Sequence, residues 1–128
     1  IYTGAHLILL LPHESREQIH AHANKISQLP LITIKLHQPH LIKGTAMAKQ
    51  YREHPEWFHL FEVDEYIDLC IDFTERLNPD FTIERFVSQS PKSLLIAPDW
   101  GLKNFEFTAK VLKRFEERKT WQGRLFNP

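Results

Sequence analysis

Cysteine is nearly absent from this chain, which has a single one, Cys70, among 128 residues. One cysteine excludes an intramolecular disulfide and favours a reducing, cytoplasmic setting. Long apolar runs are also missing, since the longest, at residues 7–12, is too short to span a bilayer. No charge of one sign dominates, because 16 basic residues balance 16 acidic ones. We therefore expect a cytoplasmic protein that binds neither nucleic acid, which usually requires a basic patch, nor membranes.

The start of the chain is unusual for a natural protein. The sequence begins with Ile1 instead of methionine and enters an apolar stretch almost at once, whereas natural termini are usually polar and loose. We therefore expect the parent protein to have residues before Ile1.

The first forty residues have the pattern of a βαβ unit. Residues 6–12 form a continuous apolar run that ends at Pro12, which is typical of a strand buried on both faces. Ile19, Ala23 and Ile26 then recur at helical spacing, and a short β-branched stretch follows Pro30. Two strands joined by such a helix are expected to be parallel, with a right-handed crossover.

The same patterns continue through the rest of the chain. Cys70 lies on the apolar face of a long helix and is expected to be a core residue. In the last helix we expect Phe105, Ala109, Leu112 and Phe115 to point inward, with Trp100, Trp121 and Phe126 packed beneath it. The sequence thus predicts an α/β fold with strands at about residues 5–12, 31–38 and 82–87 and helices at about 14–29, 45–53, 63–77 and 104–118, the helices covering one face of the sheet.

Several motifs occur in an order that resembles a known family. They are His6-Leu-Ile-Leu-Leu-Leu-Pro-His-Glu14, Ile34-Lys-Leu-His-Gln-Pro-His-Leu-Ile-Lys-Gly-Thr45 and Thr120-Trp-Gln-Gly123. Together they resemble the final βαβ unit of the partial barrel in radical S-adenosylmethionine (SAM) proteins, and most closely the YhcC-like Fe–S oxidoreductases. The resemblance implies that residues 1–128 are one C-terminal portion of a partial (β/α) TIM-like barrel with a C-terminal extension.

The resemblance also implies the cofactors. SAM and a [4Fe–4S] cluster would belong to the full-length parent, a radical SAM enzyme, but one cysteine cannot supply the three thiolates of the family's cluster motif. Leu10 and His13 replace two family glycines, which normally permit close approach of backbone to a ligand. We therefore expect this chain alone to be inactive and to bind no iron and little or no SAM. The alternative is a non-catalytic binding or scaffold module derived from the same fold.

Strand alternation puts His6, Ile8 and Leu10 on one face of the first strand. In related enzymes the residues matching His6 and Ile8 contact the SAM nucleoside. The predicted cofactor-binding residues, which would form the floor of the SAM adenine pocket, are His6, Ile8, Leu10, Pro12 and His37. The predicted substrate-mouth residues are His13, His40 and Arg85. The substrate and its reaction stay open, because a shared barrel does not fix the chemistry.

The eight histidines also raise the question of a metal site. His20 and His22 lie about 200° apart on a helix and cannot share an ion. His13, His37 and His40 would lie at the carboxyl edge of the sheet, but strand order alone does not make three ligands converge. We favour polar rim positions, either at a substrate mouth or on plain surface, and predict no metal site.

The first strand has a further consequence for partners. A strand that lacks its barrel neighbour exposes backbone N–H and C=O groups beside apolar side chains, and such edges pair readily with other chains. We therefore expect truncation-driven self-association of this chain through residues 5–12.

Overall fold

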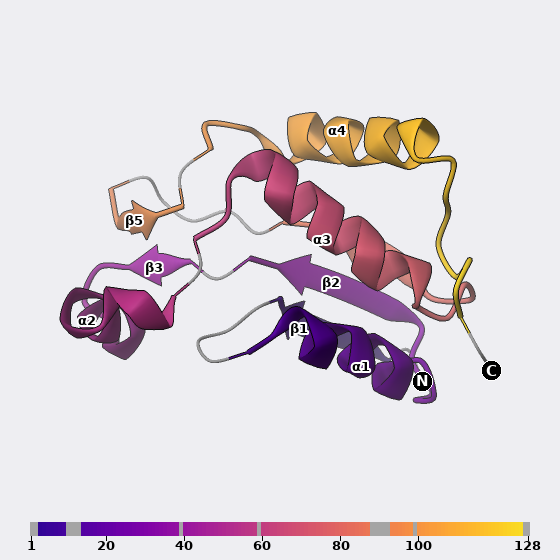
Figure 1. The fold of residues 1–128 in the computed structure, drawn as a ribbon, viewed down its shortest axis with the longest axis horizontal. Helices are drawn as coiled ribbons and strands as arrows, with labels where there is room; N and C mark the ends of the chain where they lie inside the picture. The colour runs from indigo at the N-terminus through magenta and orange to yellow at the C-terminus, as the bar shows by residue number, and fades with distance from the viewer. Residues whose placement is uncertain are drawn as a thin grey trace.

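A computed structural model describes residues 3–9, 14–38, 40–58, 60–87, 93–98 and 100–126. Its main sheet contains β1 (Gly4–Ile8), β2 (Thr33–His37) and β4 (Thr82–Arg85), in the order β1-β2-β4 (Figure 1). Both strand pairs are parallel. The predicted parallel βαβ unit and the third strand are therefore confirmed. The expected continuation of the first strand through residues 10–12 lies outside the described residues.

Two short strands and a 3-10 turn were not predicted. β3 (Leu41–Ile42) pairs antiparallel with β5 (Leu95–Ala97), and η1 (Pro55–Trp57) follows the second helix. Strands of two or three residues are too short to show an alternating pattern, so periodicity could not predict this ribbon. The ribbon lies beyond the carboxyl end of β2, away from the main sheet (Figure 1).

The four predicted helices are present, with recognisable N-terminal caps on the first two. They are α1 (Arg16–Ile26), α2 (Ala46–Glu53), α3 (Val63–Glu75) and α4 (Asn104–Glu117). α1 begins with a capping box in which Ser15 accepts from the backbone of Gln18 and the Gln18 side chain accepts from the backbone of Ser15. Thr45 caps α2, and the preceding Gly44 has a φ of 82°, a left-handed conformation that favours glycine.

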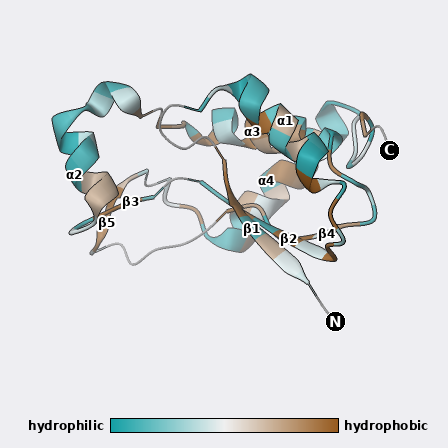
Figure 2. Ribbon diagram, turned by 90° about the horizontal axis from the view of Figure 1, so that it is seen from below, coloured by the Kyte–Doolittle hydropathy of each residue, from teal (hydrophilic) through white to brown (hydrophobic). Residues whose placement is uncertain are grey.

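One face of the main sheet carries the hydrophobic core. α3 contacts both α1 and α4, and α4 lies on the side of α3 away from α1 (Figure 1). Hydrophobic residues alternate with hydrophilic ones along α1 and α3 in Figure 2, as expected for helices buried on one side. α2 instead contacts β3 and η1, so the expectation that all four helices cover one face is wrong for α2. None of the helices in the described ranges combines the length and apolar character of a bilayer-spanning segment.

The rotation of α4 also differs from the prediction. Phe107 and Val111 are buried, whereas Phe105 is 71% and Leu112 is 56% exposed. The helix has two apolar stripes, and a single sequence cannot indicate which one faces the core. The observed rotation keeps Phe115 packed against the core and turns the arginines of the same helix toward α3.

The three aromatic residues expected beneath α4 differ in how far they are buried. Trp100 stacks on Phe107 with ring centroids 5.8 Å apart, and its indole N–H donates to the carbonyl of Phe61. Trp121 is instead 61% exposed, and Phe126 is half-buried. The prediction of a packing role is therefore confirmed for Trp100 and is wrong for Trp121.

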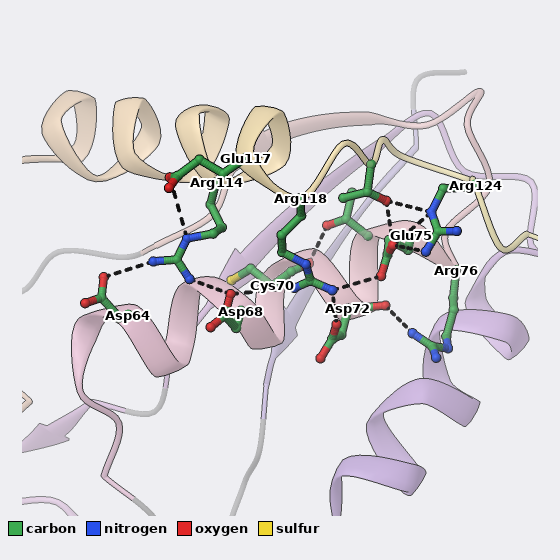
Figure 3. Close-up of polar contacts among 12 residues, drawn as sticks. Asp64, Asp68, Cys70, Asp72, Glu75, Arg76, Arg114, Glu117, Arg118 and Arg124 are labelled. Atoms are coloured by element: carbon green, nitrogen blue, oxygen red, sulfur yellow. Dashed lines mark hydrogen bonds and ion pairs between the residues drawn. The ribbon is translucent and has the colours of Figure 1, made fainter.

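An ionic ladder joins α3 to α4 (Figure 3). Asp64, Asp68 and Asp72 lie four residues apart and so share one face of α3. Arg114 of α4 reaches Asp68 at 2.6 Å and Asp64 at 3.5 Å, and Arg118 reaches Asp72 at 2.9 Å. These partly exposed pairs fix the orientation of the two helices more than they add stability.

The ladder ends at a buried carboxylate, Glu75, which is only 2% exposed. Its oxygens accept from Arg124 at 2.6 Å and from the Thr120 hydroxyl at 2.5 Å, while Arg118 lies at 3.5 Å (Figure 3). Burial alone would raise the pKa of Glu75, but the hydrogen bonds and these arginine charges outweigh it and lower the pKa. Glu75 therefore stays ionised and holds the segment after α4 against α3.

Candidate functional site on the open face of the sheet

The two faces of the main sheet differ in what covers them. Ala5 and Leu7 of β1 pair with Ile34 and Leu36 of β2, and all four pack in or against the core. The alternate residues His6, Ile8, Lys35 and His37 must project from the opposite face. We call this opposite side the open face, formed by His6, Ile8, Lys35, His37, Glu84 and Arg85. Ile8 is 46% exposed there.

Arg85 and Glu84 join the open face through a bulge in β4. The register places Ile34 opposite Ile83 but Lys35 opposite Arg85, which leaves Glu84 as an extra residue. Residues directly opposite each other in a sheet share a face, so Arg85 lies on the side of Lys35. The Glu84 carboxylate lies 3.4 Å from the Lys35 ammonium group and so neutralises much of its charge.

Two histidines form a hydrogen-bonded pair at the centre of the open face. Nδ1 of His6 lies 3.1 Å from Nε2 of His37, and the ring planes are within 8° of parallel. One of these nitrogens must carry a hydrogen and donate it, and the other must accept the hydrogen bond through its lone pair. Burial lowers the pKa of His37, and the nearby His6, Arg85 and Lys35 lower it further. His37 is therefore neutral near pH 7 and suits this hydrogen bond.

Three predicted site residues lie at the carboxyl ends of parallel strands. Ile8, His37 and Arg85 are the last residues of β1, β2 and β4 respectively. Ligand sites of parallel α/β barrels are built at this end of the strands. The structure thus brings together on one face four of the eight residues selected from the sequence, namely His6, Ile8, His37 and Arg85.

His40 lies just beyond this group. Its pKa is lowered by burial and, to a smaller extent, by the charge of His37. Nε2 of His40 is 2.5 Å from the amide nitrogen of Gln38, a 4% exposed residue that is not among the predicted site residues. Gln38 is a polar residue beside a strand end, and burial at that position has no sequence signal. The other three selected residues, Leu10, Pro12 and His13, lie outside the described residues.

A small polar cavity of about 350 Å³ opens near the amino end of the same face, lined by Gly4, Ala5, His6, Thr33, Lys35 and Glu84. A Cβ atom on Gly4 would lie 2.5 Å from the Thr33 hydroxyl, so glycine is needed for this close approach of β1 and β2. A second hollow of about 640 Å³ lies between β4, α4 and the following segment, and none of the selected site residues lines it.

Cys70 does not belong to any site. Its side chain is fully buried, and this burial raises the pKa of the thiol to about 12. The predicted core role is confirmed. Within the described residues, no three His, Cys, Asp or Glu side chains are grouped closely enough to hold a metal ion. Cys70 therefore does not fit the thiolate chemistry of an iron–sulfur cluster.

Comparisons with known proteins agree with this architecture. Residues 32–117 match the model of the Radical_SAM C-terminal domain. The chain is 33% identical over 122 residues to the uncharacterized protein YtqA of Bacillus subtilis and 30% identical over 122 residues to the uncharacterized protein MJ0486 of Methanocaldococcus jannaschii. These matches cover 95% and 94% of this chain but only 37% of each relative.

A solved structure shares the fold. Elp3 of Methanocaldococcus infernus, with an N-terminal deletion, superposes with a TM-score of 0.78 at 16% identity, covering 95% of this chain and 28% of Elp3. At this identity the likeness shows the fold alone.

Proposed function

Because this chain belongs to the Radical_SAM C-terminal domain family, we propose that it forms the last part of a radical SAM Fe–S oxidoreductase. Its open face would provide the floor of the SAM adenine pocket and part of the substrate mouth. The chain spans about 37% of the length of the curated relatives it matches, so the remaining residues of such a protein would supply the other barrel strands and the cluster cysteines.

One observation carries this proposal: a half-exposed Ile8 lies next to the hydrogen-bonded imidazoles of His6 and His37, at the carboxyl end of parallel strands. Ligand pockets combine apolar surface with a few well-placed polar groups. A flat purine fits this arrangement, because the isoleucine offers an apolar contact and the imidazole pair offers hydrogen-bonding nitrogens. Leu10 and Pro12 stay predicted members of this pocket.

The residues of this chain would bind and orient the ligands. SAM bound to a reduced [4Fe–4S] cluster supplies the radical chemistry in such enzymes, while the protein positions the reactants and excludes water. Here Ile8, His6 and His37 would hold the nucleoside. Arg85 and His40, with His13, would face the substrate. Cys70 would take no part in the reaction because its thiol is buried and protonated.

NMR titration of the 128-residue chain tests the adenine floor. We expect adenosine and SAM, at millimolar concentrations, to shift the backbone amides of Ile8 and His37 and the His6 ring signals. A His37→Ala variant should lose these shifts, whereas Trp121→Ala, at the second hollow, should keep them. Shifts confined to the second hollow would contradict the proposal. So would the absence of shifts at 10 mM ligand, which corresponds to a binding free energy weaker than about 3 kcal/mol. Micromolar affinity would also contradict it, because the chain offers only part of the pocket.

A non-catalytic binding module is the second candidate, favoured by Leu10 and His13 in place of family glycines. The open face would then bind a nucleoside without supporting its cleavage. The two candidates differ in what the rest of a full-length parent protein would contain. A three-cysteine cluster motif there supports the enzyme, and its absence supports the module.

We also propose that copies of the isolated chain associate through β1. In the described part of the chain β1 pairs only with β2, so its other edge is unpaired. That edge lies beside the exposed Ile8, and unpaired edges next to apolar residues favour pairing with another chain. Size-exclusion chromatography with light scattering should show an oligomer that Ile8→Lys disrupts. A chain that stays monomeric at high concentration would refute this proposal.

A further inference from the structure

We propose that Arg85 and His37 form an oxyanion subsite that binds a carboxylate or phosphate group of the substrate. This inference rests on the proposed function, in which the open face is the ligand-binding face. It adds the chemical class of the substrate, which neither the fold nor the relatives indicate.

The charges on the open face are unequally compensated. Lys35 is already paired with Glu84 at 3.4 Å. Arg85 is exposed and makes no ion pair or hydrogen bond within residues 3–9, 14–38, 40–58, 60–87, 93–98 and 100–126. Because Arg85 lies opposite Lys35, its side chain projects from the same face of the sheet as Lys35 and His37. The face therefore presents one uncompensated guanidinium group, the side chain best suited to carboxylate and phosphate.

The histidine pair supplies the second half of the subsite. Since Nδ1 of His6 and Nε2 of His37 bond to each other, only His6 Nε2 and His37 Nδ1 remain for a ligand. In a neutral pair one of these outer nitrogens is always a donor and the other an acceptor. An oxyanion that binds at His37 Nδ1 requires the N–H group to be on that nitrogen. His37 Nε2 is then the acceptor, so His6 Nδ1 must donate to it. The outer nitrogen of His6 then becomes an acceptor, suited to an amino group such as that of adenine.

The surrounding groups favour an anion over a cation. The titratable and charged groups around His37 are His6 on β1, Lys35 on β2, Glu84 and Arg85 on β4, and His40 beyond β2. Glu84 is the one carboxylate among these five and is held by Lys35. A cationic substrate would meet Arg85 without a free counter-charge, whereas an oxyanion would relieve the repulsion between Arg85 and a protonated His37.

Titration with inorganic phosphate at constant ionic strength tests the subsite in the 128-residue chain. We expect phosphate to shift the ring signals of His37 and to raise its pKa, because a bound anion favours the protonated imidazole. Arg85→Gln should weaken phosphate binding by about tenfold, the loss expected for one charge-assisted hydrogen bond. Arg52→Gln is the matched control, because Arg52 is exposed on α2 and this substitution removes the same charge as Arg85→Gln. This control should bind phosphate within about twofold of the parent chain.

Equal losses in Arg85→Gln and Arg52→Gln would overturn the subsite, as would phosphate shifts that bypass His37. Adenosine has no oxyanion, so its titration reports the adenine floor independently. Adenosine shifts without phosphate shifts would refute the subsite and leave the proposed function intact, and the reverse pattern would refute the adenine floor. If SAM reproduces the phosphate shifts and competes with phosphate, the oxyanion is the carboxylate of SAM and the substrate assignment is wrong. Additive shifts from SAM and phosphate together support the substrate assignment.

Discussion

The two faces of the central strand β2 differ in what contacts their side chains, although the residues of the two faces alternate along the chain. Ile34 and Leu36 are 0% exposed and pack against helices. Lys35 and His37, between and after them, lie half-buried on the open face among polar and charged neighbours. The core face is occupied by apolar contacts, whereas the open face keeps hydrogen-bonding nitrogens and a guanidinium group available. Stability and the proposed ligand binding would thus be separated by the pleat of one strand.

The charged residues show the same contrast. Where α3 meets α4 and the segment after it, Asp68, Asp72 and Glu75 are each paired with an arginine. On the open face Arg85 has no such partner within the described residues. Paired charges hold elements of the fold together, whereas the charge of Arg85 stays available for the ligand-binding role proposed for the open face.

The largest effect is expected from the core side of β2. Leu36→Ala should lower the free energy of unfolding by about 3 kcal/mol, because it leaves a cavity in a packed core. The adjacent Lys35→Ala should cost less than about 0.5 kcal/mol, because Lys35 is partly exposed and its ion pair is screened. Urea denaturation of both variants measures the difference. Similar costs at the two positions would show that the faces are not distinct.

A smaller loss is expected at the buried end of the ionic ladder. Glu75→Gln should destabilise the fold by about 2 kcal/mol near neutral pH, because Arg124 and Thr120 lose an ionised acceptor. Since folding lowers the pKa of Glu75, its contribution is complete above its ordinary pKa of 4.5 and declines as the pH falls below that value. Asp64→Asn, at the exposed end of the ladder, is the control and should have little effect. Chemical denaturation at pH 7, pH 4 and pH 3 should show the stability difference between variant and parent narrowing as the pH falls below 4.5.

The smallest effect concerns the charge state of the open face. Burial lowers the pKa of His37 from its ordinary 6.5, and the charges of His6, Arg85 and Lys35 lower it further. A lowered folded-state pKa gives stability that is complete above pH 6.5 and is lost as the pH falls through the folded pKa. His37→Gln should therefore flatten part of the stability loss between pH 7 and pH 5. Arg85→Gln should raise the pKa of His37 in an NMR titration, and an unchanged pKa would place Arg85 too far away to act.

Much of the fold could be predicted from periodicity. The βαβ unit followed from an apolar run, a helical repeat and a β-branched stretch, each long enough to show its period. The ribbon of β3 and β5 could not be predicted, because pairing between strands of two or three residues depends on tertiary contacts. The rotation of α4 also depends on its partner, since Arg114 and Arg118 find acceptors on α3 that the sequence of α4 does not contain.

The candidate site was predictable to a similar extent. Strand parity placed His6 and Ile8 on one face, opposite Leu7 and Leu9, and the structure agrees, with Leu9 buried. The hydrogen bond between His6 and His37 could not be predicted, because it depends on the register of β1 against β2. The placement of Arg85 depends on a bulge that shifts β4 by one residue. The site roles of these residues stay predictions until ligands are measured.

We expect the segment after α4 to set when folding is completed during synthesis. The amide groups of Gly123 and Leu125 donate to the carbonyls of Thr74 and Glu75, the last two residues of α3. The carbonyl end of α3 is therefore capped by residues that the ribosome adds more than forty positions later. Until that segment has been made, Glu75 lacks its partners Thr120 and Arg124, and the last carbonyl groups of α3 lack their cap. We therefore expect the nascent chain to secure this end of α3 only after residues 120–126 have been made, which would prolong the exposure of the β1 edge that has no partner strand among the described residues.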